Sequence, residues 1–420
     1  MRSAVFYGWY IVAVCFLIAL FSWGLGFYGP GIYLIELQTS HGWSTSLISS
    51  AVTAYYLVGA TLTVFIGDAF ARLGPRRVVL LGVAALGMGV VGLTVITQPW
   101  QAYAAFLLMA VGWAAMSGAA INTIIAPWFE RKRGLAISLA LNGASCGGVV
   151  MVPFLLFLIA RYGLQYGLAI AVGAMGSILV PSVLIVLRRH PDALGLRPDG
   201  EPAMARSHLE RSCNGEPQAS AWRRTALLRT GHFWTIAIPF AFGLTAQVGF
   251  LTHQIAYLEP FLGHRGAGWA VSLTTGAAVI GRVLTGLVID HLNRRRVSAV
   301  NFLCQAIAVS AMIRWPTPMF LYGACVVFGL GVGNLISLPG LLVQDEFPKE
   351  VFGKVISLIV ALNQFTFAFG PGLLGLLRDT TGSYTTSLAL CVFLQTFAAA
   401  IVLMRSPQSG QPDTIVAHSP

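Results

Sequence analysis

Long apolar runs recur along the whole chain and restrict its fold more than any other feature of the sequence. A helix needs about 20 apolar residues to cross the roughly 30 Å hydrocarbon core of a bilayer. Inside that core, only helices and closed barrels satisfy all of their backbone hydrogen bonds. Twelve runs of suitable length occur, near residues 8–30, 47–67, 78–97, 101–126, 134–159, 166–187, 233–258, 268–290, 297–314, 317–342, 354–377 and 384–404. The sequence therefore predicts an all-α membrane protein with twelve transmembrane helices.

The composition leaves no room for a large soluble domain. Of the 420 residues, 56% are hydrophobic and only 10% are charged, whereas a soluble domain carries roughly 25% charged residues. The net charge of +11 raises the question of a nucleic-acid partner, but the basic residues stand in short clusters between apolar runs, which is typical of topology signals. We therefore expect the lipid bilayer as a partner and no nucleic acid.

No arrangement of residues in the sequence indicates catalysis or a resident cofactor. The six cysteines form no CxxC pair, and nearly all lie in apolar runs, where a thiol behaves as a small hydrophobic side chain. The glycine-rich stretches, such as "GLGVGN", follow no predicted strand, which argues against a nucleotide-binding loop. We predict that the protein is not an enzyme and that it holds neither a metal nor a cofactor.

One long polar connector divides the chain into two parts. Residues 188–232 are rich in arginine, serine and proline and separate six predicted spans from six. This division predicts a six-helix bundle over residues 1–187 and a second six-helix bundle over residues 233–420. The first run is too long and too rich in Trp and Gly for a cleaved signal peptide, so we expect it to stay as a helix.

The basic residues predict how the chain is oriented in the membrane. If both termini lie inside, the inside segments hold most of the 26 basic residues, and Arg282 alone lies within a span. The outside segments then hold only Arg161, Arg265, Arg314 and Arg378. This asymmetry follows the positive-inside rule. We expect a multi-pass protein of a bacterial inner membrane, with a cytoplasmic connector, a short cytoplasmic C-terminal tail and both termini in the cytoplasm.

An internal repeat relates the two parts of the chain. The stretch "GDAFARLGPRRV" begins at Gly67 and "GLVIDHLNRRRV" begins at Gly286. With the same separation, "GLAISL" at Gly134 recurs as "GKVISL" at Gly353. Two matches at one separation predict two homologous six-helix halves, the parallel repeat of a secondary transporter, whose substrate site lies between the halves near the bilayer midplane.

These motifs resemble the major facilitator superfamily. The loop between its second and third spans has the signature Gly, three residues, Asp, a basic residue, any residue, Gly, then two basic residues. The resemblance implies two versions of a conformational latch here, made by Gly67, Asp68, Arg72, Gly74, Arg76 and Arg77 and by Gly286, Asp290, Arg294 and Arg295. The first version departs from the signature because Ala71 takes the acidic position, and Asp68 lies one helical turn earlier.

Further stretches resemble the monocarboxylate porter and oxalate–formate antiporter branches, notably "PWFERKRGLAISLALNGASCGG". These branches carry an arginine in the eighth span that binds the carboxylate of the transported acid, and Arg282 matches its position. The oxalate–formate type adds a lysine in the eleventh span, where this chain has only uncharged polar residues such as Gln364. The resemblance therefore implies a monocarboxylate rather than a dicarboxylate, with Gln364 facing the substrate.

The physical chemistry of Arg282 supports the same interpretation. None of the 15 acidic residues falls in the middle of a predicted span, and a guanidinium keeps its proton at ordinary pH. A charge at that depth costs several kcal/mol unless it is paired or hydrated. A water-filled cavity and an anionic ligand resolve the conflict, because the planar fork suits a carboxylate. The alternative is a structural arginine that snorkels or bonds backbone carbonyls.

Four other polar residues within the spans are candidates for the substrate site. His253 is either a proton acceptor or substrate ligand, or an interfacial histidine bonded to a neighbouring helix. Asn122 and Asn334 either bind substrate or hydrogen-bond between helices. Tyr28 offers a hydroxyl to the cavity or an aromatic anchor at the interface.

The sequence thus predicts a secondary transporter of small organic anions, with monocarboxylates favoured, that works by alternating access. Coupling is either proton symport, with a proton carried by His253 or by the substrate, or exchange of one anion for another. One alternative is an exporter of drugs or other metabolites, although such exporters more often use an embedded acidic residue. A second alternative is a non-transporting ligand sensor on the same scaffold.

Overall fold

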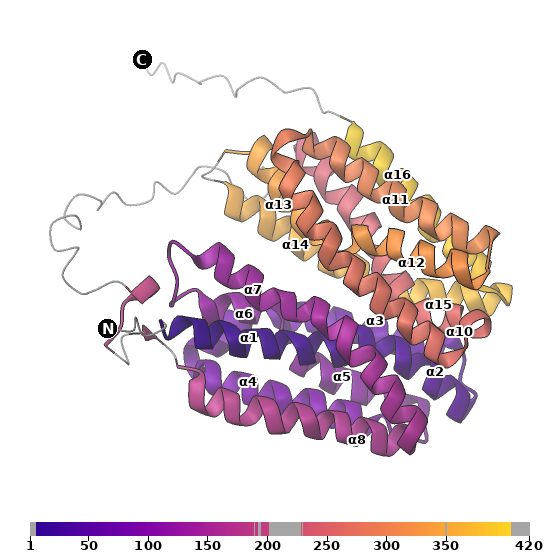
Figure 1. The fold of residues 1–420 in the computed structure, drawn as a ribbon, viewed down its shortest axis with the longest axis horizontal. Coiled ribbons are helices and arrows are strands. Elements are labelled where there is room, and N and C mark those ends of the chain that lie inside the picture. The colour runs from indigo at the N-terminus through magenta and orange to yellow at the C-terminus, as the bar shows by residue number, and fades with distance from the viewer. Residues whose placement is uncertain are drawn as a thin grey trace, which may run out of the picture.

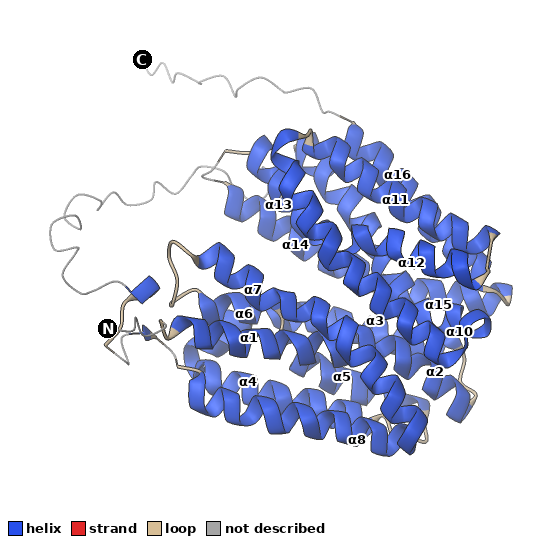
Figure 2. Ribbon diagram, in the orientation of Figure 1, coloured by secondary structure: helices blue, strands red, loops and turns tan. Residues whose placement is uncertain are grey.

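The computed structural model describes residues 6–188, 190–191, 195–200, 228, 230–348 and 351–404. Helices make up nearly all of this part of the chain, and Figure 2 shows no strand in it. The first half contains α1 (Gly8–Ser22), the π-helical turn η1 (Trp23–Tyr28), α2 (Gly29–His41), α3 (Thr45–Val64), α4 (Ile66–Gly92), α5 (Pro99–Ala115), α6 (Gly118–Ile125), α7 (Arg133–Cys146), the π-helical turn η2 (Gly147–Met151) and α8 (Val152–Val186). The second half contains α10 (Gly231–Val288), α11 (Arg294–Arg314), α12 (Pro318–Val332), α13 (Asn334–Glu346), α14 (Phe352–Phe367), α15 (Phe369–Thr381) and α16 (Tyr384–Leu403).

Ten continuous helical stretches of the described chain are long and apolar enough to cross a bilayer. Two of them, Arg133–Val186 and Gly231–Val288, have 54 and 58 residues, which is more than twice what one crossing needs. Each reverses direction at a single glycine, Gly163 (φ 78°, ψ 168°) or Gly263 (φ 69°, ψ 168°). This backbone conformation is essentially confined to glycine, so the chain can turn there without a loop. The stretches therefore supply the twelve crossings that the sequence predicts.

The turn between the second and third crossings is also shorter than the sequence suggests. The apolar runs predict a loop between residues 67 and 78, but α4 is helical through this region except at Gly74 (φ 79°, ψ 162°). Pro75 follows directly and begins the next helical segment, a position where its missing N–H group costs no hydrogen bond. The polar motif thus extends the second crossing beyond its apolar run.

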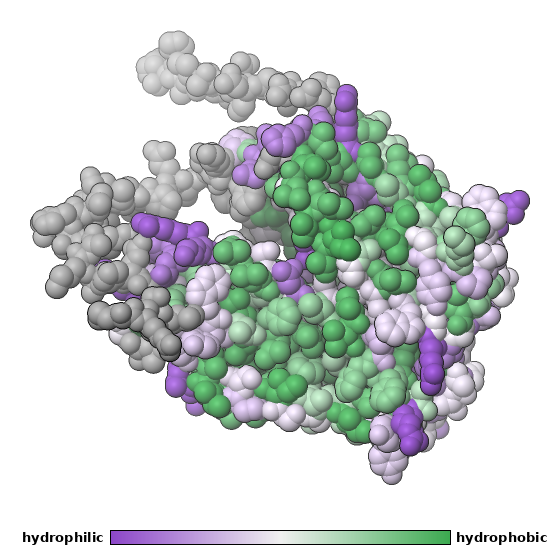
Figure 3. Space-filling model, viewed as in Figure 1, coloured by the Kyte–Doolittle hydropathy of each residue, from purple (hydrophilic) through white to green (hydrophobic). Residues whose placement is uncertain are grey.

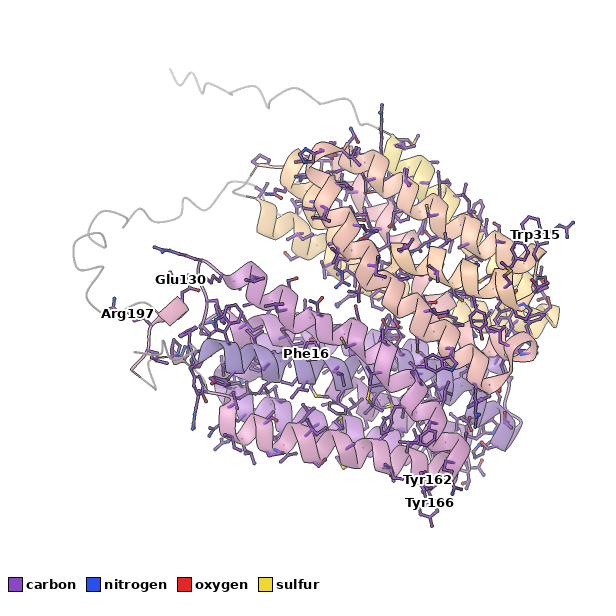
Figure 4. All side chains as sticks on the ribbon, viewed as in Figure 1. Phe16, Glu130, Tyr162, Tyr166, Arg197 and Trp315 are labelled. Atoms are coloured by element: carbon purple, nitrogen blue, oxygen red, sulfur yellow. The ribbon has the colours of Figure 1, made fainter. Side chains whose placement is uncertain are left out.

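The helices form two bundles, one built from α1 to α8 and the other from α10 to α16 (Figure 1). We call the end that carries the loops near Lys132 and Arg295 the basic end, and the end with the turns at Gly163 and Gly263 the opposite end. In Figure 4, Glu130 lies at the basic end. Hydrophobic side chains cover the middle of the face in Figure 3, and hydrophilic ones gather toward the ends, as a protein surrounded by lipid requires.

The two bundles are joined between the opposite end and the middle of the spans. Hydrogen bonds connect described residues of the two bundles, among them Ser46–Asp379, Ser49–His253, Thr53–Gly372 and Val149–Ser272. Nearer the basic end, α7 diverges from α13 and α14 in Figure 1. The structure is therefore closed at the opposite end.

Candidate functional site

Arg282 lies on the face of α10 that is turned toward the other bundle. Ser272 and Thr275, on the same face of α10, both contact the first bundle. The Ser272 hydroxyl donates to the Val149 carbonyl across the interface at 3.3 Å, and the Thr275 side chain lies where a Cβ on Gly148 would be. Arg282 follows Thr275 by two helical turns, so it projects from the same face about 10 Å closer to the basic end.

The guanidinium of Arg282 lies against Gly333, at the junction of the two helical segments of the tenth crossing. Helix α12 ends at Val332 and α13 begins at Asn334, with Gly333 between them. A Cβ added to Gly333 would lie 2.9 Å from the Nε atom of Arg282 and 3.1 Å from its Nη2 atom. A side chain at position 333 would force the guanidinium to shift, so Gly333 helps to set its direction.

No carboxylate pairs with Arg282 in the described part of the chain, and its guanidinium forms no hydrogen bond there. Its neighbours in sequence behave differently, because Arg294 pairs with Asp345 at 2.8 Å and Arg295 pairs with Glu346 at 2.6 Å. The side chain of Arg282 is half-buried. An embedded guanidinium without an internal counterion is the arrangement that an anionic ligand would complete.

Tyr28 is the sequence-predicted residue that the structure brings toward Arg282. It ends the π-helical turn η1 and is 91% buried, since 9% of its surface is exposed. Its phenol is close enough to Arg282 for the two groups to interact electrostatically. The ring also lies near Gly148, next to Thr275 of the other bundle. Tyr28 and Arg282 therefore approach one another from opposite sides of the interface.

Asn122 and Asn334 occupy different surroundings. Asn122 lies on α6 and has a buried Oδ1 atom with no hydrogen-bond partner among the described residues. Asn334 donates through Nδ2 to Thr285 at 2.9 Å and to Asn301 at 3.0 Å, both within its own bundle. Its Oδ1 atom is likewise buried without a partner. Each amide thus keeps one acceptor unused, and a substrate role for either stays a prediction.

Gln364 lies on α14 and is half-buried, with no hydrogen bond to another described residue. The preceding residue, Asn363, is 5% exposed, and its Oδ1 atom is buried without a partner. The eleventh crossing therefore presents amides and no charge in this region, as the sequence indicates.

His253 holds the two bundles together at the closed end. Its Nε2 atom lies 2.9 Å from the Pro371 carbonyl and 3.3 Å from the Ser49 hydroxyl, and its Nδ1 atom lies 3.2 Å from the Tyr384 hydroxyl. A carbonyl only accepts hydrogen bonds, so Nε2 carries the proton and Nδ1 accepts from Tyr384. The imidazole is 1% exposed and has a partner on both nitrogens.

His253 and Arg282 are well separated along the membrane normal. Both lie on α10, on the two sides of the turn at Gly263. At 1.5 Å per residue, Arg282 is roughly 13 Å further from this turn than His253. The structure therefore does not place the two side chains in one pocket, and any coupling between them acts through helix movement or through an intervening ligand.

Three of the latch residues implied by the resemblance, Arg76, Arg294 and Arg295, make contacts within their own bundle. Arg76 donates through Nε to the Leu187 carbonyl at 2.6 Å, within the first bundle. In the second bundle, Arg294 and Arg295 bind acidic residues of α13. The other latch residues lie around the turn at Gly74 and around the turn between α10 and α11: Gly67, Asp68, Arg72, Gly74, Arg77, Gly286 and Asp290. The side chain of Asp290 lies outside the described atoms, so the latch stays a prediction.

Asp379 is a residue whose contacts the sequence did not reveal. Its Oδ2 atom accepts a hydrogen bond from the backbone N–H of Ser46 at 2.6 Å, and Thr45 also donates to its carboxylate. These are the first residues of α3, so a carboxylate of one bundle caps a helix of the other. The sequence places Asp379 at the end of a span but contains no signal for a partner this distant in the chain.

Comparison with known proteins identifies the family. The Major Facilitator Superfamily model matches residues 12–371 and again residues 257–416. The chain is 27% identical over 361 residues to MFS-type transporter 1 of Ophiocordyceps sp. (strain BCC 1869), covering 82% of this chain and 73% of that protein. It is 22% identical over 422 residues to monocarboxylate transporter 12 of Rattus norvegicus, covering 94% of this chain and 85% of that protein.

Solved structures show a similar fold. A D-xylose-proton symporter superposes with a TM-score of 0.75 at 15% identity, covering 96% of this chain and 98% of that one. A bacterial homologue of the human lysosomal transporter Spinster superposes with a TM-score of 0.70 at 14% identity, covering 95% and 97%. At these identities, the likeness establishes the fold and not the substrate.

Proposed function

The chain belongs to the major facilitator superfamily, and on that premise we propose that it is a secondary transporter of small organic anions, with monocarboxylates as substrates. The observation that carries the proposal is the guanidinium of Arg282. It lies in a membrane-spanning helix, is turned toward the other bundle and meets no carboxylate among the described residues. Relatives named as monocarboxylate transporters support the substrate class.

A single carboxylate suits the surroundings of Arg282. Its planar fork accepts two carboxylate oxygens side by side, and the phenol of Tyr28 on the other bundle supplies a hydroxyl nearby. A dicarboxylate would call for a second cation, and the eleventh crossing offers the amides of Asn363 and Gln364 instead. The amide acceptors and donors fit hydroxyl or keto groups of a small acid better than a second negative charge.

The bound anion would also control closure. An empty site holds one positive charge, and sealing it from water by bringing the bundles together costs several kcal/mol. Neutralisation by a carboxylate removes most of that cost, so the loaded transporter closes at the basic end more readily than the empty one. If the basic end is cytoplasmic, as the positive-inside rule predicts, the conformation in Figure 1 is the inward-facing one.

Uptake by proteoliposomes tests the proposed function. Purified protein is reconstituted, and the initial uptake of labelled lactate, pyruvate and oxalate is compared with that of empty liposomes, with and without a proton gradient. The proposal expects saturable uptake of the monocarboxylates and less uptake of oxalate. Saturable binding without flux would support a ligand sensor, and the absence of both for every carboxylate would overturn the assignment to organic anions.

Replacing His253 with glutamine tests the proton-coupling role. Glutamine retains a donor and an acceptor for Pro371 and Tyr384 but cannot take up a proton. If His253 carries the coupled proton, an inward acid gradient should no longer stimulate lactate uptake in His253→Gln, while exchange of internal for external lactate persists. Stimulation equal to that of the wild type would show that the proton travels elsewhere, for example on the substrate.

Replacing Asp379 with alanine tests the contact that closes the opposite end. Loss of a helix cap costs about 0.5–2 kcal/mol, which corresponds to about a two- to thirtyfold shift toward the state open at that end. Ser49, fully buried in the closed state, can be changed to cysteine in a background without native cysteines to report this opening. Asp379→Ala should therefore raise the rate at which a maleimide labels Ser49→Cys by about two- to thirtyfold.

Asp345→Ala is the matched control for this experiment. Asp345 pairs with Arg294 inside one bundle, so its loss should leave the labelling rate of Ser49→Cys unchanged. If Asp379→Ala labels no faster than the parent protein, the carboxylate does not contribute to closure of the opposite end.

A further inference from the structure

A cavity opens on the outer surface of the molecule, where α8 of the first bundle meets α10 of the second near the opposite end. Its volume is about 410 Å³. The lining residues come from α8 of the first bundle and from the part of α10 that follows Gly263: Pro153, Leu156, Phe157, Ala160, Arg161, Arg265, Gly268 and Trp269. None of these residues belongs to the site around Arg282. The cavity is therefore separate from that site.

Two arginines from different bundles converge on this cavity. Arg161 and Arg265 are both exposed and line it together, although they lie far apart in the sequence. Neither forms an ion pair with a carboxylate of the described chain, and Arg161 lies over the ring of Tyr162 at 5.8 Å. Basic residues are scarce in the predicted outside segments, so two of them at one cavity make a local positive site.

The rest of the cavity wall is apolar and turned outward. Phe157 is 61% exposed and Trp269 is 62% exposed, which in a membrane protein means contact with lipid rather than with water. Tyr162 and Tyr166 project from α8 beside the turn at Gly163 in Figure 4. Exposed Trp and Tyr at the ends of spans mark the level of the lipid headgroups.

We propose that this cavity binds an anionic phospholipid, whose phosphate lies between Arg161 and Arg265 and whose acyl chain runs along Phe157 and Trp269. The paired positive charges match a phosphate in an otherwise apolar surface. The exposed aromatic side chains match the hydrocarbon that follows it. A soluble anion would satisfy the arginines but would leave these aromatic surfaces without a partner.

The position at the seam gives the lipid a mechanical role. Close to the cavity, Gly268 of α10 packs on Leu156 of α8, and Ser272 bonds Val149 deeper in the same seam. These two helices must separate when the opposite end opens. A phosphate held by one arginine from each bundle joins them, so the bound lipid stabilises the conformation that is closed at the opposite end.

Lipid binding to the purified, full-length protein tests the proposal. Native mass spectrometry and thermal unfolding compare phosphatidylglycerol with phosphatidylcholine and inorganic phosphate, for the wild type, Arg161→Gln, Arg265→Gln and Arg314→Gln. Arg314 is the matched control, because it lies at the same end over Trp315 and outside the cavity. Melting in phosphatidylcholine verifies that each variant is folded. This readout is independent of carboxylate transport.

The expected result is that phosphatidylglycerol binds at least fivefold more weakly to Arg161→Gln and to Arg265→Gln than to the wild type. Binding to Arg314→Gln should match that of the wild type, and inorganic phosphate should not displace the lipid. The proposal is overturned if both cavity variants keep wild-type binding, if Arg314→Gln loses as much as they do, or if phosphate alone competes as well as the lipid.

Discussion

Arg282→Gln is expected to lower the initial rate of monocarboxylate uptake at least 100-fold while leaving the protein as stable as the wild type or more so. A hydrogen bond to a charged group contributes about 1.5–3 kcal/mol, and the bidentate pair with a carboxylate contains two of them. Loss of both hydrogen bonds costs more than the roughly 2.8 kcal/mol that corresponds to a 100-fold lower rate. Uptake by proteoliposomes and thermal unfolding in detergent measure the two effects on the same preparation.

A lower uptake rate together with unchanged or higher stability distinguishes an arginine that binds substrate from one that only supports the fold. The buried charge is a cost to the empty protein, so glutamine should not lower the melting temperature. Arg282→Lys keeps the charge but not the planar fork, and we expect it to retain an intermediate rate. A variant Arg282→Gln that unfolds at a lower temperature yet transports normally would establish the structural role.

Gly281→Val is expected to destabilise the protein by about 1–3 kcal/mol, the usual cost of overpacking, and to impair transport with it. A Cβ at Gly281 would meet the backbone carbonyl of Leu330 on α12, and a backbone cannot move aside as a flexible side chain can. The two helices would have to separate, which carries the adjacent Arg282 away from Gly333. Thermal unfolding measures the first effect and lactate uptake measures the second.

Gly276→Ala is the matched control on the same helix. A Cβ at Gly276 would meet only the Val149 side chain, at 4.0 Å, and alanine is the better helix former. Its melting temperature should equal or slightly exceed that of the wild type. If Gly281→Val melts like Gly276→Ala, the close approach of α10 and α12 is not required for the fold.

The number of crossings could be predicted from the sequence because it depends on local composition. Apolar runs set the spans, and the basic clusters near Lys132 and Arg295 mark one end of the molecule. The turn at Gly74 could not be located in the same way. Its polar motif interrupts the apolar run but continues the helix, so hydropathy ends the span too early.

The candidate site could be located in the sequence in part. An arginine within an apolar run reveals itself in sequence, because its charge is costly wherever that run is buried. The proximity of Tyr28, the space left by Gly333 and the capping of α3 by Asp379 depend on how separate helices pack. No local pattern encodes such contacts, and the difference in depth between His253 and Arg282 depends on the turn of α10 at Gly263.

Equilibrium binding of a labelled monocarboxylate to the purified protein tests the role of Arg282 most directly, because it is independent of coupling, direction and reconstitution. Titrating wild type and Arg282→Gln with labelled lactate or pyruvate should give saturable binding at one site for the wild type and at least 100-fold weaker binding for the variant. Equal dissociation constants for the two proteins would contradict the account, since the carboxylate would then be bound without this guanidinium.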